Sequence, residues 1–119
     1  DRERKSVGAE DTFSVDIADV DEAKRELEPL VAKVWRYCES HDIGAKTVTV
    51  KIRFADFQII TRSRTHPAGF HDDSAILVAA QALLEGEHPF RKKVRLLGVT
   101  LSSLGQIERS DAAQLEFQL

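Results

Sequence analysis

The stretch that decides the fold is Thr47-Val48-Thr49-Val50-Lys51-Ile52-Arg53-Phe54. Apolar and polar residues alternate along it, and this period of two is typical of a β-strand with one buried face. The apolar positions are predicted to face a core, and the polar positions Thr47, Thr49, Lys51 and Arg53 are predicted to face away from it. A short turn at 55–58 and a second strand at 59–65 follow, so this part of the chain predicts a β-hairpin.

A strand and a helix are predicted before the hairpin. Phe13, Val15 and Ile17 alternate with polar residues and indicate a half-buried strand. A helix should begin after Asp19, whose side chain can cap the first turn. Pro29 lies inside this helix, and we expect a kink or a break there, because proline removes a backbone hydrogen bond and clashes with the preceding turn.

After the hairpin, the sequence predicts a loop, a second helix and a last strand. The loop spans 66–69, and the helix is capped by Asp72 or Asp73 and ends at Gly86. The last strand covers 94–101. The order strand, helix, strand, strand, helix, strand predicts an α+β domain. Its architecture is a two-layer β-α-β-β-α-β sandwich, a four-stranded, mainly antiparallel sheet with both helices on one face.

Such a sandwich leaves one face of the sheet without helices. We expect polar side chains of the hairpin to line this face in rows about 7 Å apart along each strand. Hydroxyl groups and cations in such rows suit a series of phosphates, and the face is therefore the candidate binding surface. Its predicted members are Thr47, Thr49, Lys51, Arg53, Arg62 and Arg64.

The charge of the chain is unevenly distributed. The formal net charge of −3 by itself disfavours a nucleic-acid partner. Acidic residues outnumber basic ones by ten to four between 10 and 42, whereas basic residues dominate by nine to five between 46 and 95. This asymmetry indicates that the hairpin and the last strand could face an anionic partner. An unevenly charged, solvated surface is the alternative interpretation.

Length and composition limit the class of protein. The 119 residues are enough for one domain with one hydrophobic core. No apolar run approaches the roughly 20 residues that span a bilayer, and we expect no membrane partner. The single cysteine, Cys38, excludes an internal disulfide and fits a reducing compartment, which we take to be the cytoplasm. Because the chain begins at Asp1 in a charged stretch, we expect a fragment of a larger protein.

The sequence shows no catalytic constellation. Asp72 and Asp73 are adjacent carboxylates, but a helix cap accounts for them. The histidines lack the spacing of metal ligands, and Cys38 falls on the apolar stripe of the first helix. We therefore predict no catalytic residue, no metal site and no cofactor in this chain.

Three segments of the chain occur in an order that is known from one family. They are Lys5-Ser6-Val7-Gly8, the hairpin through Phe54-Ala55-Asp56-Phe57 and Thr61-Arg62-Ser63-Arg64-Thr65, and RKKVRLLGV at 91–99. Together they resemble the little-finger domain, which is the C-terminal domain of Y-family translesion DNA polymerases, and the bacterial members are the most similar. The resemblance covers 2–104.

The resemblance implies a domain that lies in the major groove of double-stranded primer–template DNA and holds both backbones, with a strand order unlike that of ferredoxin. Lys5 and the backbone amides of Ser6, Val7 and Gly8 could then cradle a phosphate in a turn. Residues 1–9 would be a tether to the missing palm, finger and thumb core, 10–104 the DNA-binding domain and 105–119 a flexible tail. The parent would be a DNA polymerase whose Mg²⁺ ions are held upstream of this chain.

The last six residues resemble the clamp-binding peptide of bacterial polymerases. Leu115, Phe117 and Leu119 are the expected apolar anchors, and Gln114 supplies an orienting amide. The implied partner is the bacterial sliding clamp. A tail that packs back on its own domain is the alternative.

Two other functions are possible on this architecture. A free-standing RNA-binding module would need exposed aromatic side chains on the central strands, where this chain has Thr, Lys and Arg. A hydrolase of the acylphosphatase type would need an arginine in a phosphate-binding loop and a partner asparagine, and the chain contains no asparagine. The alternative that we retain is a free-standing nucleic-acid-binding module of ferredoxin-like topology.

Overall fold

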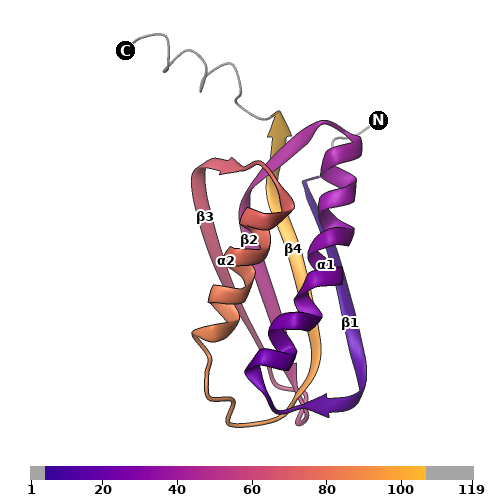
Figure 1. Ribbon diagram of the computed structural model, residues 1–119, viewed down its shortest axis with the longest axis vertical. Helices are drawn as coiled ribbons and strands as arrows, with labels where there is room; N and C mark the ends of the chain where they lie inside the picture. Colours follow the sequence, from indigo (N-terminus) through magenta and orange to yellow (C-terminus); the bar gives the residue numbers. More distant parts are fainter. Residues whose placement is uncertain (1–4, 107–119) are drawn as a thin grey trace.

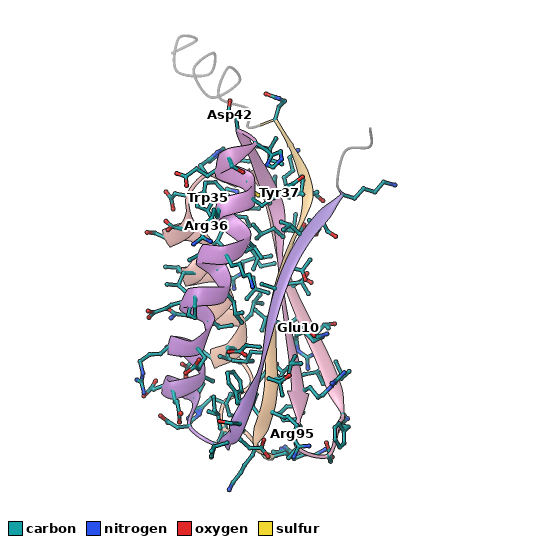
Figure 2. The ribbon with its side chains drawn as sticks, turned by 90° about the vertical axis from the view of Figure 1, so that its right-hand side faces the viewer. Glu10, Trp35, Arg36, Tyr37, Asp42 and Arg95 are labelled. Carbon is teal, nitrogen blue, oxygen red and sulfur yellow. The ribbon has the colours of Figure 1, made fainter. Side chains whose placement is uncertain are left out.

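The computed structural model describes residues 5–106, which form two layers (Figure 1). In chain order the elements are β1 (Ser6–Ile17), α1 (Val20–Ser40), β2 (Ile43–Phe54), β3 (Ile59–Phe70), α2 (Asp73–Glu85) and β4 (Val94–Gln106). Both helices lie on the same face of one four-stranded sheet, as the side view in Figure 2 shows. The predicted α+β class and the predicted order of elements are confirmed.

The strand order of the sheet is β1-β4-β2-β3, and all neighbouring strands are antiparallel. In a ferredoxin-like sheet β1 would lie in the centre, whereas here it forms an edge, as the resemblance implied. β4 lies in the centre of the sheet, and it has buried side chains on both faces. Leu96 and Leu97 are consecutive and therefore point to opposite faces, yet they are only 3% and 0% exposed.

The core lies between the helices and the sheet. The apolar stripe of α1 is buried, as are Val48, Val50 and Ile52 of β2. Burying a side chain of this size stabilises a fold by about 1.5–3 kcal/mol. Asp19 and Asp72 cap the two helices, accepting hydrogen bonds from the backbone N–H groups three residues on, at 3.1 and 2.8 Å. The sequence therefore predicted the helix starts and the buried stripes correctly.

The structure corrects two local expectations. Of the kink or break expected at Pro29, the break is absent, because α1 continues through this residue to Ser40. Pro29 lies on the exposed side of the helix, where water can satisfy the carbonyl group that loses its partner. Val15 is 77% exposed and not half-buried, because the register between β1 and β4 is irregular between Thr12 and Ile17.

All four strands are longer than the sequence indicated, and β2 begins at Ile43, four residues before the predicted strand. β1 begins at Ser6, inside the segment that we expected to be a tether. β3 continues through the predicted loop at 66–69, which bulges between the pairs Thr47–Thr65 and Ala45–Phe70. β4 extends to Gln106 because the start of β2 supplies hydrogen-bonding partners for it. Polar residues occur at the ends of these strands, so the sequence pattern did not predict that the ends pair with a neighbouring strand.

Candidate nucleic-acid interface

The face of the sheet opposite the helices carries four rows of side chains. Residues paired directly across antiparallel strands point to the same face, so the register defines each row. From β1 across to β3, the rows are Ser6, Ser102, Thr47 and Thr65; Gly8, Thr100, Thr49 and Ser63; Glu10, Gly98, Lys51 and Thr61; Thr12, Leu96, Arg53 and Ile59. We call these sixteen residues the open face.

Hydroxyl groups dominate the open face and come from all four strands. Two pairs bridge β2 and β3, with Thr47 Oγ1 2.8 Å from Thr65 Oγ1 and Thr49 Oγ1 2.7 Å from Ser63 Oγ. A hydroxyl that accepts from one neighbour can still donate to a phosphate oxygen. Neighbouring strands are about 4.8 Å apart, so the hydroxyls form a closely spaced grid of donors.

The charges of the open face are few. Lys51 Nζ forms an ion pair with Glu10 Oε1 at 2.7 Å. Arg53 lies in the last row, beside Leu96, which is buried although it belongs to this face. The Nε of Arg53 is shielded from solvent and has no hydrogen-bond partner within residues 5–106. The two predicted cations of β2 are therefore on the open face, and Lys51 already has an anionic partner.

The predicted position of Arg62 and Arg64 is wrong. Arg62 pairs with Val50 and Arg64 with Val48, so both arginines point to the helix side of the sheet. Both arginines are nevertheless exposed, and β3 is an edge strand of the sheet. Arg62 Nε forms an ion pair with Glu87 Oε2 at 2.9 Å.

Three of the four β3 residues on the open face carry hydroxyl groups. They are Thr61, Ser63 and Thr65, whereas the fourth, Ile59, is apolar. None of the three hydroxyl-bearing residues was among the predicted members of this face. Their spacing of two residues, matching that of Thr47 and Thr49, is the signal that could have identified them. Ser102 of β4 was missed because the predicted strand ended at Leu101. Thr100 lies inside the predicted strand but was not assigned to a face.

The segment Lys5 to Gly8 does not form a phosphate-binding turn. Ser6, Val7 and Gly8 are part of β1, and Val7 is 8% exposed with its side chain in the core. Ser6 and Gly8 lie on the open face, and Lys5 is exposed directly before the strand. A Cβ at Gly8 would lie 2.9 Å from Thr100 Oγ1, so the glycine is explained by packing across the sheet.

Further charged side chains surround the turn between β2 and β3, at the end of the open face. Lys92 Nζ lies 2.7 Å from Asp56 Oδ2, and this hydrogen bond lowers the pKa of Asp56, with a smaller contribution from the backbone N–H of Gln58. Arg95, labelled in Figure 2, pairs with Asp16 at 3.4 Å and lies over the ring of Phe57 at 4.9 Å. Phe57 is 63% exposed and has a positive φ of 71°.

Other expectations concern metals, membranes and the tail. Within residues 5–106, no three His, Cys, Asp or Glu side chains converge as metal ligands would. Neither helix has the length and hydropathy needed to cross a bilayer. The predicted clamp-binding residues, Gln114, Leu115, Phe117 and Leu119, lie outside the described part of the chain.

Comparison with known proteins identifies the family. Residues 4–117 match the C-terminal domain of the impB/mucB/samB family. Since the match covers nearly the whole chain, the chain belongs to this family. DNA polymerase IV 2 of Agrobacterium fabrum is 54% identical over 122 residues, which cover 100% of this chain and 34% of that protein. The chain thus spans about a third of the length of this relative.

Solved structures confirm that the fold is that of a Y-family little-finger domain. A chimeric Y-family DNA polymerase superposes with a TM-score of 0.79 at 20% identity, over 88% of this chain and 30% of that one. The little-finger domain of PolIV, solved in complex with the beta-clamp processivity factor, superposes with a TM-score of 0.67 at 24% identity. That alignment covers 82% of this chain and 86% of the other. The resemblance predicted from the sequence is confirmed.

Proposed function

We propose that this chain is the DNA-binding domain of a translesion DNA polymerase of the DNA polymerase IV type, and that its open face holds primer–template duplex by the phosphate backbone. The observation that carries the proposal is the grid of hydroxyl groups and cations on a sheet face without helices. Family membership supports it. Nucleotidyl transfer, and the carboxylates that hold Mg²⁺ for it, would belong to the rest of the polymerase.

The composition of the open face suits binding that does not depend on base sequence. Serine and threonine hydroxyls and the cations Lys51 and Arg53 would contact phosphates, which position a duplex without reading its bases. Lys5 and Ser6, at one end of the face, would extend these contacts. An enzyme that copies damaged templates needs such tolerance. Because the open face has few charges, we expect weak binding by the isolated domain, which a covalent link to the polymerase core would strengthen.

The charge of the helix layer favours the open face, and not the helix side, as the DNA-binding surface. α1 and α2 together carry seven acidic and four basic residues. A phosphate backbone would be repelled by that surface. A free-standing module of ferredoxin-like topology remains the second candidate, but the strand order and the longer relatives do not favour it.

Two charge reversals of equal size test which face binds DNA. Lys51→Glu with Arg53→Glu changes the open face, and Arg62→Glu with Arg64→Glu changes the helix side of β3. Duplex binding is measured by fluorescence anisotropy at several salt concentrations. We expect the first variant to bind about tenfold more weakly or worse, with a salt slope smaller by about two.

The second variant should lose less affinity, because its arginines point away from the open face. Equal losses, or a larger loss in the second variant, would refute the open face as the binding surface. Binding of one duplex sequence strongly over others would refute recognition through the backbone.

We also propose that the tail binds the bacterial sliding clamp through Gln114, Leu115, Phe117 and Leu119. The support is the sequence of the tail and the existence of a clamp complex of a little-finger domain with the same fold. A domain with these partners would work in the bacterial cytoplasm, with the polymerase core, the clamp and DNA in one assembly.

A further inference from the structure

The ion pair between Glu10 and Lys51 crosses the middle of the open face. Glu10 is on β1 and Lys51 on β2, and β4 lies between these strands. Two strand spacings separate the backbones by about 10 Å, yet Nζ and Oε1 are 2.7 Å apart. Both side chains therefore extend across β4 toward each other. Figure 2 shows Glu10 on the side of the sheet away from the helices.

Gly98 permits this contact. It pairs directly with both Glu10 and Lys51. A Cβ at position 98 would lie 3.3 Å from the Cβ of Glu10 and 3.6 Å from the Cβ of Lys51. A larger side chain would stand between the carboxylate and the ammonium group. The glycine therefore leaves a gap in the row, and the ion pair lies over it.

The ion pair is open to an incoming ligand. The side chain of Lys51 is 33% exposed and that of Glu10 is 52% exposed. Exposed ion pairs are weak, commonly below about 1 kcal/mol, and exchange partners readily. Glu10 is also the one acidic residue among the sixteen of the open face. It thus places a negative charge where the proposed function requires phosphates.

We propose that Glu10 competes with DNA phosphates for Lys51 and thereby weakens the grip of the open face on duplex DNA. This inference rests on the proposed function. When a phosphate approaches, Lys51 exchanges the carboxylate for it, and Glu10 is left beside the backbone as an unpaired like charge. Both effects lower the affinity. A polymerase domain must release the backbone each time the duplex advances, and an internal competitor for the central lysine makes that release faster.

A single neutral substitution with a matched control tests the competition. Glu10→Gln keeps the size of the side chain and removes its charge. Glu85→Gln makes the same change in net charge and also breaks a lysine ion pair, that of Lys24 at 3.1 Å, but on the helix layer. We expect Glu10→Gln to tighten duplex binding about three- to tenfold and to increase the salt slope by about 0.9. Glu85→Gln should leave both nearly unchanged.

A double-mutant cycle separates competition from simple repulsion. In a Lys51→Gln background, Glu10→Gln should give less than half of its gain in affinity, because no lysine is left to release. An undiminished gain would show that Glu10 acts on DNA directly and would overturn the competition. Weaker binding by the Glu10→Gln variant alone would show that Glu10 positions Lys51 for phosphate, and this result would also overturn it.

The failure of this inference can be distinguished from the failure of the proposed function. If the unmodified chain binds duplex DNA and Glu10→Gln binds with the same affinity, only the competition is refuted. If the unmodified chain shows no duplex binding even at low salt, the proposed function is refuted, and the inference with it. Urea denaturation of each variant confirms that folding is unchanged.

Discussion

Asp56 and Lys92 show how single contacts stabilise the end of the sheet beside the open face. The ammonium group of Lys92 donates to Asp56 Oδ2 and also contacts the side chain of Gln58. These contacts join the β2–β3 turn to the segment before β4. Because the pKa of Asp56 is lowered in the folded chain, the carboxylate stabilises the fold above its usual pKa. This contribution is lost as the pH falls through the lowered value.

Removing the lysine should raise the pKa of Asp56. We expect Lys92→Met to move it up toward its usual value, since the hydrogen bond from Lys92 is the largest cause of the shift. The chemical shift of the Asp56 carboxyl carbon, followed by NMR against pH, measures this change. Lys93→Met is the control, because Lys93 makes no ion pair with Asp56 within residues 5–106. A pKa that stays low in Lys92→Met would assign the shift to the Gln58 amide.

At the scale of elements, α1 tolerates a residue that usually ends a helix. Pro29 lies in the interior of the 21-residue helix. On its buried side the helix packs Leu27, Leu30 and Val31 into the core, each at most 5% exposed. This apolar burial exceeds the penalty of a proline in a helix interior, which is about 3 kcal/mol. Tertiary packing therefore overrides the local preference of the sequence.

Replacing this proline should stabilise the domain. Pro29→Ala restores the missing backbone N–H and relieves the clash with the preceding turn. It also raises the conformational entropy of the unfolded chain, which offsets part of the gain in stability. We expect the free energy of unfolding to rise by about 1–2 kcal/mol, as measured by urea denaturation. Glu28→Ala, at the neighbouring exposed position, should change it by less than about 0.5 kcal/mol. A loss of stability in Pro29→Ala would mean that the helix is adapted to the proline.

At the scale of the whole molecule, the proposal assigns the two partners to different parts of the chain. The open face would bind DNA, and the residues after Gln106 would bind the clamp. Such a division predicts that either function can be removed without the other. A tail that packed on its own domain would instead couple the two.

Alanine substitutions in the tail test this division. Leu115→Ala, Phe117→Ala and Leu119→Ala together should reduce clamp binding at least about tenfold, because they remove the apolar anchors. Duplex DNA binding should stay the same. Glu116→Ala with Gln118→Ala changes the intervening residues and is the control. Surface plasmon resonance with immobilised clamp measures the affinity, and equal binding by both variants would contradict the assignment of the anchors.

The sequence by itself determined the α+β class, the order of elements, the helix caps and the buried rows, because these depend on periodicity and on contacts within a few residues. It also identified Lys51 and Arg53 as outward-facing residues of β2. Short motifs were sufficient to identify the family.

Only the tertiary structure decided which residues share the open face. Strand pairing determines the face of each side chain, and a shift of one residue reverses it. For this reason Arg62 and Arg64 lie on the helix side of the sheet, and the open face carries Thr61 and Ser63 at the positions where the arginines were predicted. The contact between Glu10 and Lys51 depends on the insertion of β4 between β1 and β2. Pairing between residues so distant in the chain leaves no periodic pattern from which it could be read.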